Sequence, residues 1–364
     1  MSMRALLATI TLASLIALVA CSGSTHQFAY ITTPFNNGIS AYRLDTNTGS
    51  FSQVLGSPYL TGISPTAVVI HPSGKFAYVS NAGENTISLY KIGSTGALTE
   101  VMPRTLTDQQ PAALMMDPGG AFLFAANSFS NTITVYSITA SSGALKLIST
   151  PSYPTSGFTP VRGTIAPSGK FLYVANSNSA SISGFAVSST GALTAVPNSP
   201  IAVGNGPNWI AIDNSNKFLY VANLEDGTFS GFTIDSGTGA LTPMGGSPFG
   251  VANTSTAIVP VSSVVVDASG KYVYVTTLTT SSSVYGYTID GTSGVPTAAI
   301  TGSTFASGGT SGFIVPDTTG KLLFVGNQTS NTISGYKITP STGVLTLLST
   351  TSTGTAPTAM VVIK

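Results

Sequence analysis

Charged side chains are scarce in this sequence. Only 7% of the 364 residues are Asp, Glu, Lys or Arg, whereas about a quarter is typical of soluble domains. The 13 basic and 12 acidic residues almost cancel, which argues against the basic face that a nucleic-acid-binding protein needs. Apolar residues still make up 42% of the chain, enough for a large core. The surface must therefore consist mainly of Ser, Thr, Asn and Gly, a composition that suits an exported protein.

Cysteine and histidine are also scarce. The chain has one cysteine, Cys21, and two histidines, His26 and His71. These numbers exclude a disulfide framework and a zinc site built from His and Cys. A Ser-His-Asp triad would have to use His71, which we place in a turn. The motifs of serine hydrolases, zinc proteases and P-loop proteins are absent, so we expect neither a metal nor another cofactor.

The N-terminus carries an apolar run, residues 5–17, behind the basic Arg4. This run is too short to count as a transmembrane helix. It leads into Leu18-Val19-Ala20-Cys21, which resembles the bacterial lipobox, where the signal peptide is removed before a cysteine that is then acylated. An ordinary signal peptide with an incidental cysteine is the alternative. We favour the lipobox, because the single cysteine of the chain occupies that position.

This interpretation divides the N-terminal region into a signal peptide, 1–20, and an acylated tether, 21–27. Buried lipid chains anchor a protein to a membrane without a spanning segment. We therefore expect the protein to be exported and held at the bacterial cell envelope by lipid alone. Ser22 after the cysteine favours the outer membrane.

A six-residue apolar stretch recurs seven times along the chain. Its copies begin at Phe28, Phe76, Phe122, Phe171, Phe218, Tyr272 and Leu322, which are 46 to 54 residues apart. Self-similarity at such a period indicates a repeat architecture. Around Phe76, short runs bounded by Gly, Pro, Asn and Ser predict four strands per unit, at 65–70, 76–80, 86–92 and 97–101.

The turns between these strands are the most regular part of the unit. A glycine recurs between the third and fourth strands, at Gly49, Gly96, Gly143, Gly191, Gly239, Gly294 and Gly343. A second glycine precedes the apolar stretch in five units, and Asn216 takes its place in a sixth. Asn is among the few other residues that tolerate a positive φ. These positions are therefore structural. An Asn that follows the predicted second strand in five units is best explained by a hydrogen bond that orders the next loop.

The two ends of the repeat are incomplete in complementary ways. The first copy, at Phe28, has no first strand before it, and the final segment, 357–364, resembles 65–70 but has nothing after it. Pairing these ends closes a ring and removes the free sheet edge. The sequence thus predicts an all-β fold over 28–364, a seven-bladed β-propeller of four-stranded antiparallel blades.

The recurring pattern P-S-G-K-F-x-Y-V-x-N, N-T-I-S-x-Y and T-G-A-L-T resembles the lactonase-type seven-bladed propellers, the family of bacterial 6-phosphogluconolactonase, and the YVTN-repeat surface proteins. The resemblance covers 28–364. It implies hydrolysis of cyclic sugar esters at the mouth of the central channel, without a firmly required metal. Family motifs rich in histidine open two central blades, where this chain reads Pro-Val-Arg-Gly at 160–163 and Pro-Asn-Trp at 207–209.

Charges that do not recur from unit to unit point to the candidate site. Most recurring charges flank the first turn of each unit and indicate turn chemistry and solubility. Six charges fall on the opposite face and do not recur, namely Glu84, Arg104, Asp108, Arg162, Glu225 and Asp226. Two irregular stretches, 245–260 and 276–283, are either binding loops or ordinary insertions.

Two functional hypotheses remain open. In the first, the protein is a lactone hydrolase in which Glu225 activates water, Arg162 stabilises the oxyanion, and Asn208, Trp209, Asp226 and Glu84 bind a carbohydrate or lactone. In the second, it is a non-catalytic binding or interaction propeller with an envelope protein as partner. The pocket itself has a plainer alternative, namely scattered solvated charges and a Trp that fills the channel.

Overall fold

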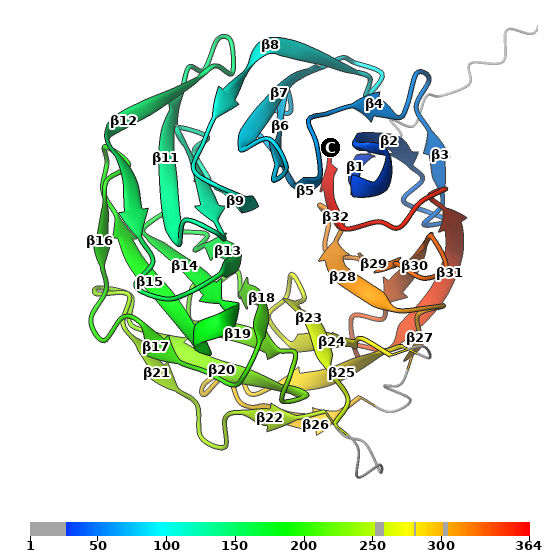
Figure 1. Cartoon of the computed structure of the whole chain (residues 1–364). Coiled ribbons are helices and arrows are strands. Elements are labelled where there is room, and N and C mark those ends of the chain that lie inside the picture. Colours follow the sequence, from blue (N-terminus) through cyan, green and yellow to red (C-terminus); the bar gives the residue numbers. More distant parts are fainter. Residues whose placement is uncertain (1–26, 252–257, 280–281, 301–304) are drawn as a thin grey trace, which may run out of the picture.

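Seven antiparallel sheets are arranged in a ring around a central axis (Figure 1). The computed structural model describes residues 27–251, 258–279, 282–300 and 305–364. It confirms the predicted seven-bladed propeller. The predicted signal peptide and acylated Cys21 lie outside the described residues, as do parts of the two irregular stretches. Within the described ranges, no helix is long and apolar enough to cross a bilayer.

Each blade orders its strands A, B, C and D from the channel outward. Blade 1 consists of β32 (Ala359–Ile363), β1 (Gln27–Thr33), β2 (Gly38–Leu44) and β3 (Phe51–Gln53). Blade 2 consists of β5 (Pro65–Ile70), β6 (Phe76–Asn81), β7 (Thr86–Ile92) and β8 (Leu98–Leu106). Blade 3 consists of β9 (Pro111–Met116), β10 (Phe122–Asn127), β11 (Thr132–Ile138) and β12 (Leu145–Pro154). Blade 4 consists of β13 (Pro160–Ile165), β14 (Phe171–Asn176), β15 (Ser181–Val187) and β16 (Leu193–Ala195).

The remaining blades repeat this order. Blade 5 consists of β18 (Pro207–Ile212), β19 (Phe218–Asn223), β20 (Thr228–Ile234) and β21 (Leu241–Pro243). Blade 6 consists of β23 (Val261–Val266), β24 (Tyr272–Thr277), β25 (Ser283–Ile289) and β26 (Pro296–Ala299). Blade 7 consists of β28 (Ser311–Pro316), β29 (Leu322–Asn327), β30 (Thr332–Ile338) and β31 (Leu345–Ser352). Short strands pair with strand C in four blades: β4 (Tyr59–Leu60), β17 (Ile201–Ala202), β22 (Phe249–Gly250) and β27 (Phe305–Ala306). Two B–C loops contain 3-10 turns, η1 (Pro34–Asn36) and η2 (Ser177–Ser179).

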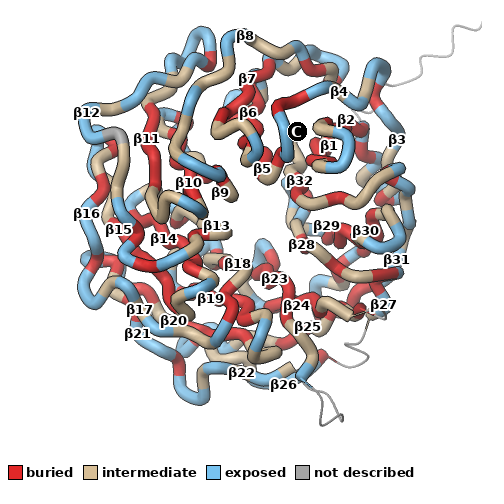
Figure 2. The backbone as a smooth tube through the Cα atoms, in the orientation of Figure 1, coloured by how far each residue is buried: buried red, intermediate tan, exposed pale blue. Residues whose placement is uncertain are grey.

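Strand B is covered on both faces, as its continuous apolar sequence predicts (Figure 2). All six residues of β14 and all six of β19 are buried. The buried clusters lie between neighbouring blades, and one of them joins Tyr173 of blade 4 to Leu219 and Phe232 of blade 5. The core is therefore a ring of inter-blade layers.

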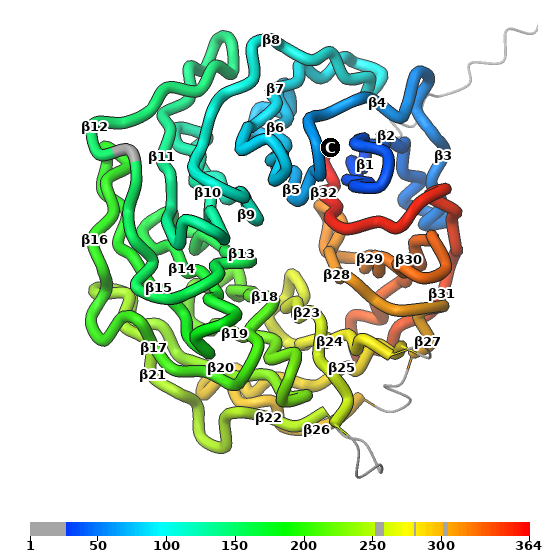
Figure 3. Tube along the Cα trace, viewed as in Figure 1, coloured from blue at the N-terminus to red at the C-terminus, as the bar shows by residue number. Residues whose placement is uncertain are grey.

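The C-terminal strand closes the ring, as predicted. β32 pairs antiparallel with β1 from Phe28↔Ile363 to Thr32↔Ala359, so the first and last described strands lie side by side (Figure 3). Blade 7 is joined to blade 1 by further contacts. Gln27 Nε2 donates to Asp317 Oδ2 at 3.1 Å, and Ser349 Oγ donates to the Gly49 carbonyl at 2.6 Å.

A hydrogen bond that recurs between neighbouring blades links the two recurring motifs, the apolar stretch of strand B and the glycine of the C–D turn. In five blades the strand-B Tyr donates its hydroxyl to the C–D-turn glycine carbonyl of the next blade, in the pairs Tyr30–Gly96, Tyr78–Gly143, Tyr173–Gly239, Tyr220–Gly294 and Tyr274–Gly343, at 2.5 to 3.0 Å. These five glycines have φ between +71° and +81°. A Cβ on Gly143 would lie 2.7 Å from the Phe76 ring of the preceding blade. The positive φ and the close contact both require glycine.

Polar residues that recur with the strands also make structural bonds. The Asn that ends strand B donates to two hydroxyls of strand C, as Asn223 does to Thr228 and Ser230 at 3.0 and 2.9 Å, which confirms the predicted structural hydrogen bond. In the A–B turn, buried Asp213 accepts the backbone N–H groups of Lys217 and Phe218 at 2.8 and 2.7 Å. Recurrence in this chain therefore marks fold rather than activity.

His71 lies at the equivalent A–B turn of blade 2. Its ring nitrogens contact Ser73 Oγ at 2.8 Å and the Gly120 carbonyl of blade 3 at 3.0 Å. Both contacts are made within the turn or to the neighbouring blade, which confirms that His71 is a turn residue.

Candidate functional site

The entrance of strand A carries a repeated β-bulge. In six blades the pairing between strands A and B skips one residue, which is Thr66, Ala112, Val161, Asn208, Ser262 or Gly312. A bulge frees a residue from the ladder and re-aims its side chain. In blade 1, Thr358 precedes β32 and its N–H donates to the Thr32 carbonyl at 3.2 Å. Seven strand entrances therefore converge at one end of the channel, the mouth.

A cavity of about 300 Å³ lies at this mouth. It is lined by Pro34, Pro65, Thr66, Ala112, Val161, Arg162, Asn208, Gly312, Gln328 and Thr358. These residues come from all blades except blade 6, and they include one charge, two amides and two hydroxyls. A larger cavity of about 430 Å³ lies between blades 1 and 7, with no charged residue in its lining. The mouth cavity is the better candidate, because it gathers side chains that differ from blade to blade.

Arg162 is the cation of this cavity. Its Nη2 reaches from blade 4 to the Thr358 carbonyl of blade 1 at 3.3 Å, and its guanidinium carbon lies 4.8 Å from the centre of the Trp209 ring. Desolvation lowers the pKa of Arg162 to about 10, so the group remains charged at neutral pH. Among the described residues, no carboxylate forms an ion pair with it. A desolvated cation without a counter-ion is costly, and an anionic or partly anionic ligand oxygen would offset that cost.

Trp209 packs inside the channel beside this cation. It contacts the cluster between blades 5 and 6, and also the cluster of blades 7 and 1 that contains Phe313 and Met360. Trp209 does not line the mouth cavity. It fills part of the channel, as the plainer alternative predicts, and its ring also supports Arg162 by a cation–π contact.

Asn208 connects blade 5 to blade 6. Its Nδ2 donates to the Ser262 carbonyl at 2.9 Å, and the residue also lines the cavity. Because this bond uses an amide hydrogen, the Asn208 amide is held in place before a ligand enters. The structure thus brings together Arg162, Asn208 and Trp209, three of the predicted site residues.

Glu225 and Asp226 lie apart from the cavity lining, on the loop after β19. Asp226 accepts hydrogen bonds from the N–H and the Nδ2 of Asn205, at 2.6 and 2.9 Å. Glu225 is exposed, and a Cβ on Gly206 would lie 2.7 Å from its Cγ. Neither carboxylate lines the cavity. Their roles as general base and ligand-binding group remain predictions.

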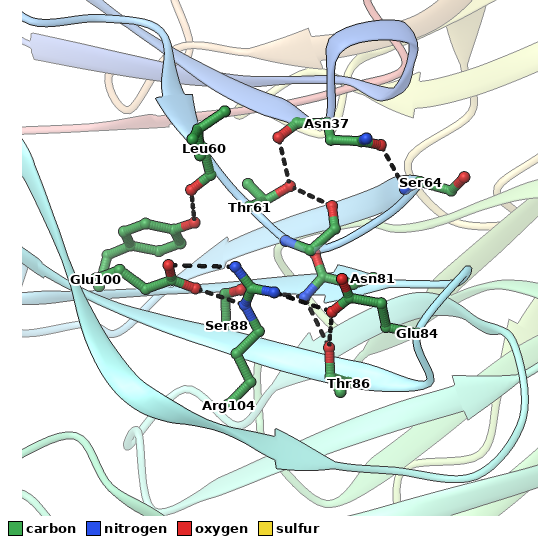
Figure 4. A network of polar contacts seen from close by, with 12 residues as sticks. Asn37, Leu60, Thr61, Ser64, Asn81, Glu84, Thr86, Ser88, Glu100 and Arg104 are labelled. Atoms are coloured by element: carbon green, nitrogen blue, oxygen red, sulfur yellow. Dashed lines mark hydrogen bonds and ion pairs between the residues drawn. The ribbon is translucent and has the colours of Figure 1, made fainter.

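Glu84 belongs to an ion-pair cluster on blade 2 (Figure 4). Arg104 donates to Glu84 at 3.0 Å and to Glu100 at 2.8 Å. The hydrogen bond to Glu100, followed by the two negative charges, raises the pKa of Arg104. A binding role for Glu84 remains a prediction, and a ligand would have to share this carboxylate with Arg104.

The sequence predictions missed one glycine and three polar residues of the cavity, namely Gly312, Thr66, Gln328 and Thr358. A usable signal exists for two of them. Thr66 and Thr358 each follow the proline that opens a strand-A segment, the position that Val161 and Asn208 also occupy. Within the described ranges, no group of three or more His, Cys, Asp or Glu side chains is close enough to hold a metal ion.

Comparison with known proteins agrees with this fold. The profile of the family "Lactonase, 7-bladed beta-propeller" matches residues 20–159, 163–256 and 250–362. A candidate 6-phosphogluconolactonase from Bacteroides fragilis is similar in structure, with a TM-score of 0.78, 20% identity and coverage of 94% of this chain and 99% of that one. The Pseudomonas aeruginosa periplasmic gluconolactonase PpgL is also similar, with a TM-score of 0.77, 19% identity and coverage of 93% and 99%. No curated protein matches the sequence significantly. Because the profile covers most of the chain, the protein belongs to the lactonase family of seven-bladed β-propellers.

Proposed function

We propose that the mouth cavity binds a sugar lactone and that the protein hydrolyses it to the open-chain acid. The observation that carries the proposal is Arg162, a cation that lines a cavity otherwise formed by amides, hydroxyls and apolar groups. Lactones present a carbonyl oxygen that becomes negative during hydrolysis, and a fixed cation at that point stabilises the transition state.

The proposed reaction uses residues of the mouth face. Glu225 accepts a proton from water, whose oxygen attacks the lactone carbonyl carbon. Arg162 stabilises the oxyanion of the tetrahedral intermediate. The intermediate collapses with cleavage of the ring C–O bond, and the departing alkoxide takes up the proton. Asn208 and Gln328 supply amide groups for the sugar hydroxyls, which fits their place in the cavity lining.

The charges of the mouth favour an unphosphorylated lactone. A phosphate monoester carries about −1.5 to −2 charges at neutral pH, and the cavity lining supplies the single cation Arg162. Arg104, the other basic residue of this face, is bound to Glu84 and Glu100. We therefore expect a neutral aldonolactone to be preferred over its 6-phosphate.

A non-catalytic binding propeller is the second candidate. It is favoured by the absence of any carboxylate or histidine among the described residues that line the cavity. In that case Arg162 and the amides would hold a carbohydrate or an aldonate, and an envelope protein is the alternative partner.

We further propose that the protein is exported and lipid-anchored through Cys21, in the outer membrane. The support is the lipobox-like sequence 18–21 and the similarity to a structure named as a periplasmic gluconolactonase.

Kinetics with matched variants test the enzymatic proposal. Hydrolysis of glucono-δ-lactone and of its 6-phosphate is followed above the buffer rate. We expect Arg162→Met to lower kcat about 100- to 1,000-fold and Glu225→Gln to lower it about 100-fold or more. Arg104→Met is the control and should retain turnover. Turnover that survives in both site variants would refute this site, and ligand binding without turnover by the unmodified protein would establish the binding alternative.

A further inference from the structure

The basic residues of the propeller gather on the face opposite the mouth. Strands A and B, and strands C and D, are joined by turns on that face, which we call the turn face. It carries ten of the twelve described basic residues: Arg43, Lys75, Lys91, Lys146, Lys170, Lys217, Lys271, Lys321, Lys337 and Lys364. All ten are exposed. In five blades one of these lysines directly precedes strand B, so the cations form a ring rather than a single cluster.

The acidic residues of the turn face are largely committed to the backbone. Seven carboxylates lie there, which leaves a net charge of +3. Asp213, Asp267 and Asp317 are buried. Each of the three accepts backbone N–H groups of its own turn, such as those of Lys271 and Tyr272 on Asp267, at 2.9 and 2.8 Å. Three of the seven negative charges are therefore buried, whereas all ten basic side chains of the face are exposed.

The mouth face has the opposite charge. It carries Arg104 and Arg162 against Glu84, Asp108, Glu225 and Asp226, which gives −2, while Glu100 lies on the outer strand β8 between the two faces. Residues 27–364 are formally neutral, with twelve charges of each sign. The separation of these charges gives the domain a dipole along the channel axis.

The N-terminal part of the chain also joins the domain at the turn face. Gln27, the first described residue, donates to Asp317 of a turn on that face. The segment from Cys21 to Gln27 spans at most about 25 Å when fully extended. A chain held at a bilayer near Cys21 would therefore keep the turn face, and not the mouth, beside that bilayer.

We propose that the turn face docks on a membrane rich in anionic phospholipid. Lysines close to an anionic bilayer are attracted to its negative surface potential, whereas the mouth face, at −2, would be repelled by it. Docking in this orientation leaves the mouth cavity open to the aqueous side. The inference rests on charge placement and not on any catalytic activity, so failure of the lactonase proposal would leave it standing.

Vesicle binding of residues 27–364 tests this inference. This segment includes every described strand of the closed ring. We expect co-sedimentation with vesicles of 70% phosphatidylcholine and 30% phosphatidylglycerol, little with pure phosphatidylcholine, and release by salt. Each cation near the surface contributes about fivefold to partitioning. Replacing Lys75, Lys170, Lys217, Lys271 and Lys321 by Gln should reduce partitioning at least about tenfold, and replacing the same five by Arg should retain it.

Orientation is measured with single cysteines, because residues 27–364 contain none. An environment-sensitive fluorophore at Thr292→Cys, on a C–D turn, should respond to anionic vesicles. The same probe at Phe35→Cys, an 84% exposed residue on the mouth face, should not respond. Equal binding to both vesicle types, unchanged binding of the Gln variant, a response at Phe35 alone, or binding to a soluble acidic polysaccharide but not to vesicles would each overturn the proposal.

Discussion

The Tyr–Gly contacts between blades allow a quantitative test of what holds the ring together. Tyr78 is fully buried, and its hydroxyl donates to the Gly143 carbonyl of the next blade at 2.7 Å. Tyr78→Phe keeps the ring but leaves that carbonyl without its donor. A buried group that loses its partner costs about 1–3 kcal/mol. We expect Tyr78→Phe to lower the free energy of unfolding by this amount.

Equilibrium unfolding in urea measures this change. Tyr59→Phe is the matched control, because the Tyr59 hydroxyl bonds to the Leu55 carbonyl at the exposed rim, and we expect a change below about 0.5 kcal/mol. Blade 3 offers the converse experiment, since Phe124 occupies the Tyr position there. Phe124→Tyr should add about 0.5–1.5 kcal/mol if its hydroxyl reaches the Gly191 carbonyl. Equal stabilities of Tyr78→Phe and Tyr59→Phe would refute the role assigned to these contacts.

Two further predictions concern alkaline pH and ring closure. Burial raises the pKa of Tyr78, and it raises the pKa of Tyr136 and Tyr336 to about 12. Because the folded pKa values exceed the unfolded value of about 10, this stabilisation is complete below pH 10 and is lost as pH rises toward 12, by about 1.4 kcal/mol per pH unit for each such tyrosine. Urea unfolding between pH 8 and 11.5 should show the decline, with a smaller slope in Tyr78→Phe, and a constant stability would contradict it. Deletion of residues 357–364 removes strand A of blade 1 and exposes the edge of β1, so we expect loss of the cooperative transition and association of the chain. Size-exclusion chromatography tests this, and a stable monomer with the original urea midpoint would show that closure is dispensable.

The fold was predictable because its determinants recur. The sequence shows the period of the repeat, the glycines of the turns and the two incomplete ends that complement each other. Most observed strands of blade 2 begin and end close to the predicted ones. Strand D is the main difference, since β8 runs from Leu98 to Leu106 rather than ending at residue 101. Glycine and asparagine signals mark where a hairpin turns, so they predict the ends of strands that are joined by tight turns. The far end of strand D has no such signal, because this outer strand pairs with strand C alone.

The candidate site was only partly predictable. Arg162 and Trp209 are visible as departures from the repeat, and both lie in the channel. The neighbours of Arg162 across the ring, Thr358 and Gln328, are far from it in sequence, and only closure brings them together. The direction of a loop side chain such as Glu225 depends on local contacts, here with Gly206, that no periodic pattern encodes.

The central claim is that Arg162 makes the channel mouth a binding site for a lactone carbonyl. The most direct test is calorimetric titration with glucono-δ-lactam, a non-hydrolysable analogue that keeps the carbonyl oxygen. We predict saturable one-to-one binding that weakens at least about tenfold in Arg162→Met, as expected for the loss of a charge-assisted hydrogen bond, and is unchanged in Arg104→Met. Equal affinity of the Arg162→Met variant and the unmodified protein, or no binding by either, would contradict the claim.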